Sequence, residues 1–409
     1  MTKKNRKPQI RFAGFHDTWE QRKRSEILIE HNIRTSDFEN NPLYSLTIES
    51  GITPKTERYE RNSLVTKTED LFKVVKPNEF VTNPMNLRFG ALGYNTNPYN
   101  ISVSGYYDVF SIDNDRCSGF WNSYFKTPIA MKIFNNAAIG SLIEKRRVKY
   151  STLQQLDFYM PKALEEKVLI GRYMDFLDNL ITLHQRKLVK LTNIKKSMLD
   201  KLFPKNGSSV PEIRFRGFTE AWEQRKLSEI TDKVTEKNSG LQYVEIFTNS
   251  AEFGIISQRD FFDHDIAKLS SLDGYYIVKN EDFVYNPRIS TSAPVGPINR
   301  NKLGRTGVVS PLYTVFRPHD VDTTYLEHFF KCVYWHSFMN FNGDSGARSD
   351  RFSIKDDVFF QMSIPLPHID EQKKIGELLT CLDNLITLHQ RKLEKLKNLK
   401  KACLEKMFV

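Results

Sequence analysis

Two long segments of the chain carry apolar residues at alternating spacings of four and three, the pattern of a helix that packs along a partner helix. The positions are Leu177, Ile181, His184, Leu188, Leu191, Lys195, Met198 and Leu202 in the first segment, and Leu382, Ile386, His389, Leu393, Leu396, Lys400, Cys403 and Met407 in the second. At ~1.5 Å per residue, a helix of about 40 residues is roughly 60 Å long. We predict that the two helices pack antiparallel as a coiled coil; the alternative is that each packs separately on its own domain.

Apolar residues beside this seam widen the apolar stripe of each helix. They are Leu180, Leu183 and Ile194 in the first helix, and Leu385, Leu388 and Leu399 in the second. A stripe wider than a two-stranded seam requires implies a further binding partner. We interpret the two seam histidines, His184 and His389, as polar residues that fix the helix register rather than as ligands or catalysts.

The chain is an internal duplication. The segment LDNLITLHQRKL occurs at Leu177–Leu188 and again at Leu382–Leu393. An opening motif, PQIRFAGFHDTWEQRKRSEI at Pro8–Ile27, returns as PEIRFRGFTEAWEQRKLSEI at Pro211–Ile230. Each half therefore has an opening motif, a variable block and a long helix. Near-identical helices with different blocks between them indicate a fixed scaffold that carries two different binding surfaces.

The variable blocks share a pattern of short strands. β-branched and aromatic runs alternate with Asn, Pro and Gly, which predicts mostly β blocks with a few helices. Phe80-Val81 followed by Asn83-Pro84 returns as Phe283-Val284 followed by Asn286-Pro287. We therefore predict an α+β fold: two similar mostly-β domains separated by a pair of long antiparallel coiled-coil helices, with a pseudo-two-fold internal repeat.

The same pattern divides the chain into six segments. Proline and glycine in residues 204–210 end the first helix and indicate a flexible linker. The expected boundaries are a basic tail at 1–7, a first mostly-β domain at 8–162, a central helix at 163–203, the linker at 204–210, a second mostly-β domain at 211–368 and a C-terminal helix at 369–409.

Composition fits a soluble protein with a polyanionic partner. Hydrophobic residues make up 40% of the chain and charged residues 27%, and the sequence has no apolar run long enough to cross a bilayer. The basic start, MTKKNRK, is not followed by an apolar segment, and the four cysteines have no paired spacing. Together these features predict reduced thiols in a cytoplasm. The net charge of +11 indicates nucleic acid or an anionic membrane surface as the partner.

Motifs for catalysis are missing from the sequence. It has no GxxxxGK[ST] phosphate loop, and Asn97-Pro98-Tyr99 lacks the second proline of the motif by which DNA amino-methyltransferases hold a flipped base. A Glu-x-Lys pattern like that of metal nucleases occurs at Glu165–Lys167 and Glu371–Lys373. Both copies lie at helix starts, so we expect solvated first-turn charges there.

One cluster, His328, Cys332 and His336, has the spacing of metal ligands on a helix. Adjacent members are close enough to share an ion, but on one helix the outer two are roughly 12 Å apart, too far for a single tetrahedral zinc site. We therefore expect a packed, aromatic-rich helix here and predict a non-catalytic chain without a metal.

The order of opening motif, variable block and repeated helix, twice over, resembles the specificity (S) subunit of Type I restriction–modification enzymes. The residues that carry the resemblance are Arg11-Phe12, Gly14-Phe15 and Trp19-Glu20, their copies Arg214-Phe215, Gly217-Phe218 and Trp222-Glu223, the run Gly307–Tyr313, and Ile364–Pro367 leading into Glu371–Ile375. The similarity spans nearly the whole chain. In the first block, Val103–Tyr107 replaces the Ser-Pro-Leu-Tyr run.

This resemblance implies two target recognition domains, each of which binds one half of a split, asymmetric site in double-stranded DNA. It also implies that the helices dock two methyltransferase (modification) subunits, which use S-adenosylmethionine. It leaves open whether two restriction (endonuclease/translocase) subunits, which use ATP and Mg, join them. The chain itself would need no cofactor and would be a non-catalytic subunit of a DNA adenine methyltransferase/restriction endonuclease complex.

Candidate DNA-binding residues follow from the chemistry of the duplex. Lys and Arg contact phosphates, and Arg or Asn side chains in loops contact base edges. In the first block the candidates are Arg88, Tyr94, Asn95, Lys145, Arg146 and Arg147; in the second they are Arg288, Arg300, Lys302, Arg305, Arg348 and Arg351. The alternative for each of them is an ordinary surface position.

Two other functions fit parts of the pattern. A non-catalytic helical scaffold that binds protein partners would explain the long helices, but its assembled complex would not retain one DNA sequence over a scrambled duplex. A lone nuclease or methyltransferase would turn over DNA with Mg²⁺ and S-adenosylmethionine in the absence of a second polypeptide.

Overall fold

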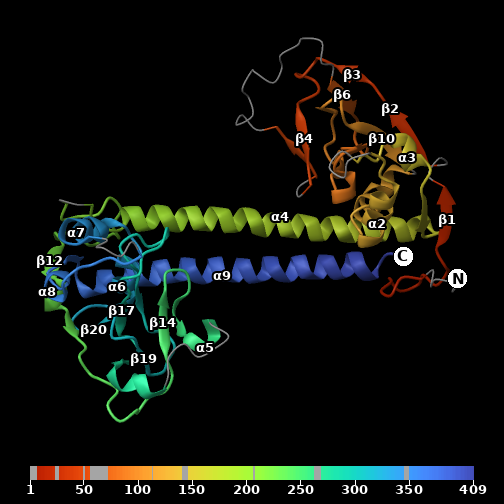
Figure 1. Cartoon of the computed structure of the whole chain (residues 1–409). Coiled ribbons are helices and arrows are strands. Elements are labelled where there is room, and N and C mark those ends of the chain that lie inside the picture. The colour runs from red at the N-terminus through yellow and green to blue at the C-terminus, as the bar shows by residue number, and fades with distance from the viewer. Residues whose placement is uncertain are drawn as a thin grey trace. The chain divides into compact units, whose positions relative to one another are not determined.

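The chain forms two compact units that share both long helices. The computed structural model describes residues 7–23, 27–48, 51–55, 72–112, 114–140, 146–205, 208–261, 269–344 and 350–409. The first unit contains residues 1–186 and 390–409, and the second contains residues 187–389. Helix α4 runs from Leu164 to Lys201 and helix α9 from Ile369 to Lys406, each without a break (Figure 1). Each unit therefore holds one variable block and a part of each long helix.

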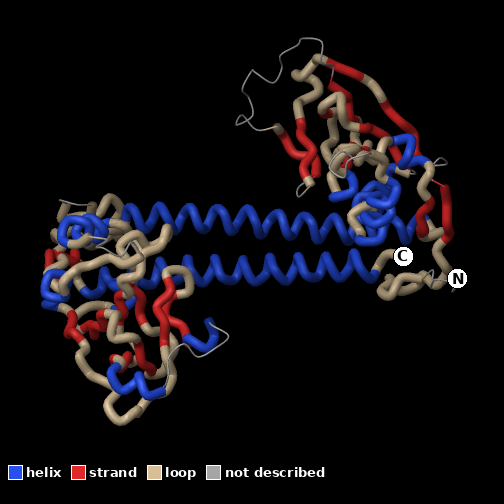
Figure 2. The backbone as a smooth tube through the Cα atoms, viewed as in Figure 1, coloured by secondary structure: helices blue, strands red, loops and turns tan. Residues whose placement is uncertain are grey.

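The first unit is built from short strands and three short helices. The strands are β1 Glu20–Lys23, β2 Leu28–His31, β3 Arg34–Thr35, β4 Tyr44–Thr47, β5 Gly51–Pro54, β6 Phe72–Val75, β7 Phe80–Thr82, β8 Leu92–Tyr94, β9 Ile101–Val103, β10 Asp108–Ile112 and β11 Asp157–Met160. The helices are α1 Ser118–Tyr124, α2 Pro128–Ala137 and α3 Tyr150–Gln154, with 3₁₀ turns η3 Leu87–Phe89 and η4 Asp115–Cys117. Figure 2 shows the strands of each unit grouped beside its helical segments.

The central sheet of the first unit has the antiparallel order β2-β10-β7-β8. Successive side chains of a strand point to opposite faces, so Phe80 and Val81 of β7 lie on different faces, and both are fully buried. Phe80 stacks on Phe110 of β10 with ring centroids 5.8 Å apart, in the core that includes the helices. Val81 and Val109 belong to a smaller core with the outer strands.

The second unit repeats this plan. Its strands are β12 Glu223–Lys226, β13 Thr231–Lys233, β14 Phe247–Ser250, β15 Gly254–Ser257, β16 Tyr276–Val278, β17 Phe283–Tyr285, β18 Ile298–Arg300, β19 Gly307–Val309, β20 Thr314–Pro318 and β21 Ser363–Leu366. Its helical elements are α5 Gln258–Phe261, α6 Thr323–Phe329, α7 Tyr334–Asn342, α8 Asp356–Phe359, η6 Leu227–Glu229 and η7 Leu269–Gly274. The sheet order β13-β20-β17-β18 matches that of the first unit, and Phe283 stacks on Phe316 at 5.5 Å as Phe80 does on Phe110.

Each variable block is completed by the helix end that comes from the other half of the sequence. In the first unit, Phe408 after α9 lies 6.3 Å from Trp19 and 5.6 Å from Phe120, measured between ring centroids. In the second unit, Phe203 after α4 lies 5.4 Å from Tyr325 in the same way. Since Trp19 belongs to the repeated opening motif, this motif supplies part of the core that receives the helix end.

The two long helices are antiparallel where they pair within a unit, as the heptad pattern predicted. In the first unit Lys400 pairs with Asp178. Cys403, three residues further along α9, contacts Tyr173, which lies five residues earlier on α4. In the second unit Lys195 pairs with Asp383 at 2.5 Å. The two lysines in the seam, Lys195 and Lys400, therefore each bond an aspartate of the facing helix. The alternative of two separately packed helices is wrong.

Close backbone approach fixes each block on its long helix. A Cβ added to Gly171 of α4 would lie 2.5 Å from the backbone nitrogen of Phe120, so α1 crosses α4 with no room for a side chain. At the equivalent crossing of α6 and α9, a Cβ on Gly376 would meet the Thr324 side chain and the Tyr325 nitrogen at 3.1–3.2 Å. The second crossing is therefore less tight than the first.

This difference predicts unlike effects of one substitution at two equivalent sites. Replacing glycine by alanine inside a helix stabilises it by about 1 kcal/mol, whereas an overpacked contact costs about 1–3 kcal/mol. We expect Gly171→Ala to lower the melting temperature because its neighbour is backbone, and Gly376→Ala to change it little. Scanning calorimetry of both variants tests this, and an equal loss in the two variants would contradict it.

Candidate nucleic-acid interface

In the first block, the structure brings together two of the segments that supply candidate DNA-binding residues. The Val148 nitrogen donates to the Pro84 carbonyl at 2.9 Å, which places Arg147 beside the loop that follows Asn83-Pro84. Arg147 itself exchanges two backbone hydrogen bonds with Ile139, at 3.0 and 2.9 Å, and its side chain is exposed.

The second block repeats this arrangement with other side chains. The Phe352 nitrogen donates to the Pro287 carbonyl at 2.8 Å, and the backbones of Arg288 and Arg351 pair as an isolated bridge. Arg288 is 68% exposed and lies 3.8 Å from the Asp350 carboxylate, a loose and solvated ion pair. Arg351 lines a cavity of about 430 Å³ between this loop and strands β13 and β20.

The remaining candidates on these loops have mixed surroundings. The Arg88 guanidinium lies 4.4 Å from the ring centroid of Phe89, over its face, and Arg88 is half-buried, as is Arg146. Lys145 and Arg348 lie outside the described residues.

Two candidates of the first block point inward. Asn95 is 1% exposed, and its amide donates to the carbonyls of Val75 and Tyr99 at 3.0 and 2.9 Å. The Tyr94 hydroxyl donates to Asp175 of α4 at 3.1 Å, and burial raises the pKa of the phenol. Both side chains therefore hold the block together instead of facing solvent.

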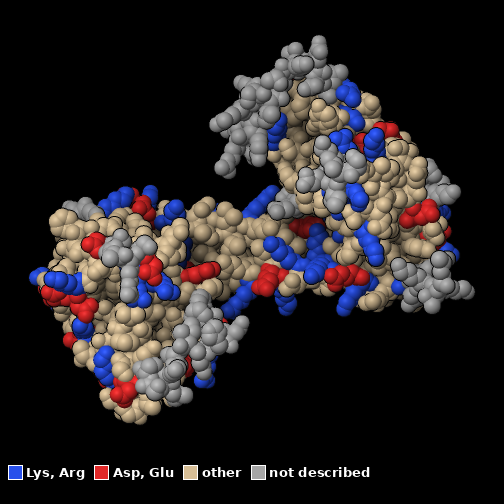
Figure 3. Space-filling model, in the orientation of Figure 1, with Lys and Arg blue, Asp and Glu red and all other residues tan. Residues whose placement is uncertain are grey.

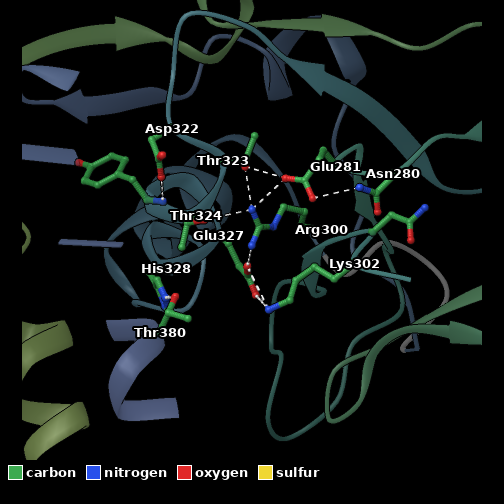
Figure 4. Close-up of polar contacts among 12 residues, drawn as sticks. Asn280, Glu281, Arg300, Lys302, Asp322, Thr323, Thr324, Glu327, His328 and Thr380 are labelled. Atoms are coloured by element: carbon green, nitrogen blue, oxygen red, sulfur yellow. Dashed lines mark hydrogen bonds and ion pairs between the residues drawn. The ribbon is translucent and has the colours of Figure 1, made fainter. Parts of the chain in front are cut away.

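Arg300 and Lys302 belong to an internal ion-pair cluster at the start of α6 (Figure 4). Arg300, whose side chain is 9% exposed, contacts Glu327 at 2.6 Å and Glu281 at 3.0 Å. Lys302 donates to the same Glu327 at 3.0 Å, although the lysine is 56% exposed. Thr323 donates to Glu281 at 2.7 Å and closes the network. The Arg300 charge is thus neutralised inside the block.

Arg305 is also committed to a carboxylate. Its guanidinium forms two hydrogen bonds of 2.7 Å with Glu245, and that pairing raises the pKa of Arg305 and lowers the pKa of Glu245. The distribution of charge alone does not identify a DNA-binding surface. Figure 3 shows Lys and Arg on the visible face of each unit, with Asp and Glu among them.

Two bidentate ion pairs with buried glutamates were not found from the sequence. Glu166 and Glu371, in the first turns of α4 and α9, are 1% and 0% exposed. Arg11 bonds both oxygens of Glu166 at 2.6 and 2.7 Å, and Arg214 bonds Glu371 twice at 2.8 Å. The expectation of solvated first-turn charges is therefore wrong for Glu371, and also for Lys167, which is 7% exposed. The repeated Arg-Phe of the opening motif was the signal that pointed to these pairs.

The cluster of His328, Cys332 and His336 does not lie on one helix, so that expectation is wrong. Helix α6 ends at Phe329 and α7 begins at Tyr334. The Cys332 thiol donates to the Phe329 carbonyl at 2.8 Å, and burial raises its pKa to about 12. Among the residues that the structure describes, no group of three or more His, Cys, Asp or Glu is arranged to hold a metal. The expected aromatic packing is present, with Phe329, Phe330 and Trp335 in the core.

Both long helices expose the same apolar side chains. Leu183 of α4 and Leu388 of α9 are 46% and 45% exposed, and both belong to the identical repeated segment. In the second unit, Leu385 and Leu388 line a groove of about 540 Å³ together with Cys381 and with Thr324 of α6. None of the helices in the described part of the chain is long and apolar enough to cross a membrane.

Comparison with known proteins gives a consistent result. The family described as "Type I restriction modification DNA specificity domain" matches residues 219–398. The MjaVIII specificity subunit of a Type I restriction enzyme from Methanocaldococcus jannaschii is 26% identical over 252 residues, covering 58% of each chain. The putative MjaX specificity subunit from the same organism is 26% identical over 296 residues, covering 66% of this chain and 64% of that protein. The chain thus spans about 60% of the length of these relatives.

The fold is also known. The crystal structure of a Type-I restriction-modification system S subunit from M. genitalium superposes with a TM-score of 0.61 at 11% identity. The superposition covers 98% of this chain and 99% of that one. At this identity the likeness concerns the fold, including the long helix pair and the two similar blocks.

Burial of His328 predicts a pH-dependent stability. Burial lowers its pKa from 6.5 to about 4, so between these values the unfolded chain binds a proton that the folded chain does not. Stability should therefore fall as the pH drops through this window, by up to about 3 kcal/mol from this residue. We expect His328→Gln to flatten the decline of melting temperature between pH 6.5 and 4, with His368→Gln, at an exposed position, as the control. Parallel declines in wild type and His328→Gln would contradict this.

Proposed function

We propose that the chain is a specificity subunit of the Type I restriction–modification family, as its match to that family over residues 219–398 supports. In this role it selects a two-part, asymmetric DNA site for methyltransferase subunits that dock on its long helices. It is the non-catalytic member of this assembly. S-adenosylmethionine is bound by the methyltransferase subunits, and ATP and Mg by restriction subunits where these are present. The cytoplasm is where such a complex meets its DNA.

One observation supports recognition of two unlike half-sites. Equivalent backbone hydrogen bonds, Val148 to Pro84 and Phe352 to Pro287, hold the candidate loops in the same place on two copies of one fold. The side chains on these loops differ between the copies. Two different surfaces on one repeated frame suit a DNA site whose halves differ in sequence, because base edges are distinguished by the side chains that meet them.

The exposed or half-buried candidates on these loops are the best supported as DNA contacts. They are Arg88, Arg146 and Arg147 in the first block and Arg288 and Arg351 in the second, and Lys145 and Arg348 adjoin them in the sequence. Arg300, Lys302 and Arg305 already have carboxylate partners and would have to leave them to bind a phosphate. Tyr94 and Asn95 support the loops from inside.

Methyltransferase docking is supported by the exposed leucines of the repeated segment. Folding of the helix pair requires the seam residues, but it does not require Leu183 and Leu388 to be exposed and identical in both copies. Large exposed apolar side chains that gather in a patch mark binding surfaces. Because the surface occurs twice, it suits two copies of one partner. The a/d residues of the seam support docking indirectly, because they fix the position of these leucines on the helix surface.

A scaffold that binds protein partners alone is the second candidate. It would use the same leucines and would give no role to the basic loops. Sequence-specific retention of a duplex by the assembled complex separates the two functions.

The DNA-binding proposal predicts a ranking of arginine substitutions. Arg147→Ala and Arg351→Ala should each weaken binding of the assembled complex to its site by about 1–3 kcal/mol if the residue contacts a base, or reduce the salt dependence by about one ion if it contacts a phosphate. Arg305→Ala, which removes an internally paired charge, is the matched control and should have a smaller effect. Salt-titrated binding to the duplex measures all three. Unchanged affinity in Arg147→Ala and Arg351→Ala would remove these loops from the interface.

The docking proposal predicts a stepwise loss of partner subunits. A charged side chain in an apolar interface is costly to desolvate, so Leu183→Asp or Leu388→Asp alone should leave one methyltransferase per chain, and the double variant none. Val189→Asp, at a 61% exposed position whose counterpart is Glu394, is the control and should keep both partners. Native mass spectrometry of the co-purified complex counts the subunits. Two methyltransferases on the double variant would refute the proposed surface.

A further inference from the structure

The loops of the first block expose an unusual set of apolar side chains. Met85 is 40% exposed, Phe89 51% and Ile139 73%. Backbone hydrogen bonds join Val148 to Pro84 and Arg147 to Ile139. The segment that carries Met85 is thus linked to the segment that carries Ile139 through residues 147–148. Turn η3, which ends at Phe89, packs on α2, and α2 leads into Ile139. The three exposed side chains are therefore carried by segments that contact one another.

The equivalent positions in the second block are polar or buried. Arg288 follows Pro287 where Met85 follows Pro84, and Asp344 lies two residues after the end of α7 as Ile139 lies two residues after the end of α2. Val295, which precedes the left-handed Gly296 as Phe89 precedes the left-handed Gly90, is 0% exposed. The loop of the second block is also longer and carries exposed Ser290, Thr291 and Ser292. At these three equivalent positions the second block therefore exposes no apolar side chain, and its exposed Leu312 and Phe341 lie at other positions.

This difference points to DNA rather than to a shared protein partner as the occupant. A methyltransferase that docks on both halves would require the same surface in both, as the helices provide. The first-block surface is flanked by Arg88, Arg146 and Arg147, whose positive charge complements phosphates. In the major groove, the apolar group presented by a base is the C5 methyl of thymine.

We infer that the first block recognises its half-site by contact of Met85, Phe89 and Ile139 with thymine methyl groups, whereas the second block recognises its half-site by polar contacts without them. The inference rests on the proposed DNA-binding function and extends it to the bases read. It assigns A·T pairs to the half-site of the first block.

Replacement of thymine by uracil tests this directly, because it removes the methyl group and keeps the base pair. The site is first mapped by sequencing methylated adenines, and 5-iododeoxyuridine crosslinking with peptide mass spectrometry assigns each half-site to a block. Uracil in the first-block half-site should weaken binding of the assembled complex about fourfold per contacted methyl, or about 0.8 kcal/mol at 1.4 kcal/mol per tenfold. Uracil in the other half-site should change binding less than 1.5-fold.

Variants connect the effect to the named side chains. With Met85→Ser, Phe89→Ser and Ile139→Ser combined, the response to uracil should disappear, and with Ile29→Ser, a 63% exposed residue on edge strand β2, it should remain. If the triple variant does not fold, each single substitution should remove part of the response.

The results separate the inference from the function on which it rests. A complex without any sequence preference refutes the proposed function. A complex that selects its site refutes the inference alone if the first-block half-site lacks thymine, if uracil there has no effect, if both half-sites respond equally, or if the serine variants keep the response.

Discussion

The insertion of a helix end from one half of the sequence into the variable block of the other half is the contact on which the rest of the structure depends. Phe203 packs with Tyr325 and Phe329, and Phe408 packs with Trp19 and Phe120, so neither block has a complete core from its own half. Each buried phenyl ring contributes about 1.5–3 kcal/mol relative to an exposed one. The two halves therefore stabilise each other, which explains why a duplicated chain keeps both copies of its helices.

Buried ion pairs then fix orientation more than they add stability. The carboxylates of Glu166 and Glu371 have lost nearly all contact with water, and each is compensated by a bidentate arginine from the opening motif. A buried pair of this kind contributes little net free energy, but loss of one partner costs about 3–5 kcal/mol because the other charge remains buried. The bidentate arrangement of guanidinium and carboxylate thereby fixes how the opening motif of each half packs against the start of a long helix.

The molecule carries some surfaces that are the same in both halves and others that differ between the halves. Under the proposed function, the exposed leucines of the repeated segment are constrained by a partner that is the same for both halves. The loops after Asn83-Pro84 and Asn286-Pro287 would be free of that constraint, since each would need to fit only its own stretch of DNA. The backbone that holds these loops is nevertheless conserved between the halves, so a change of loop sequence alters the surface without altering the fold.

The sequence by itself determined the duplication, the antiparallel helix pair and the two similar mostly-β blocks, because periodicity and self-similarity are properties of the linear chain. It also indicated the loop segments that carry Arg147 and Arg351. Tertiary structure alone decided which charged residues are available. Arg300 and Arg305 have carboxylate partners 19 and 60 residues away in the sequence, and Glu371 has an arginine partner 157 residues away. It also showed that His328 lies at the end of α6 whereas Cys332 lies in the break before α7. The physical reason is that an ion pair or a buried side chain depends on distances in space between residues remote in sequence, which no local pattern encodes.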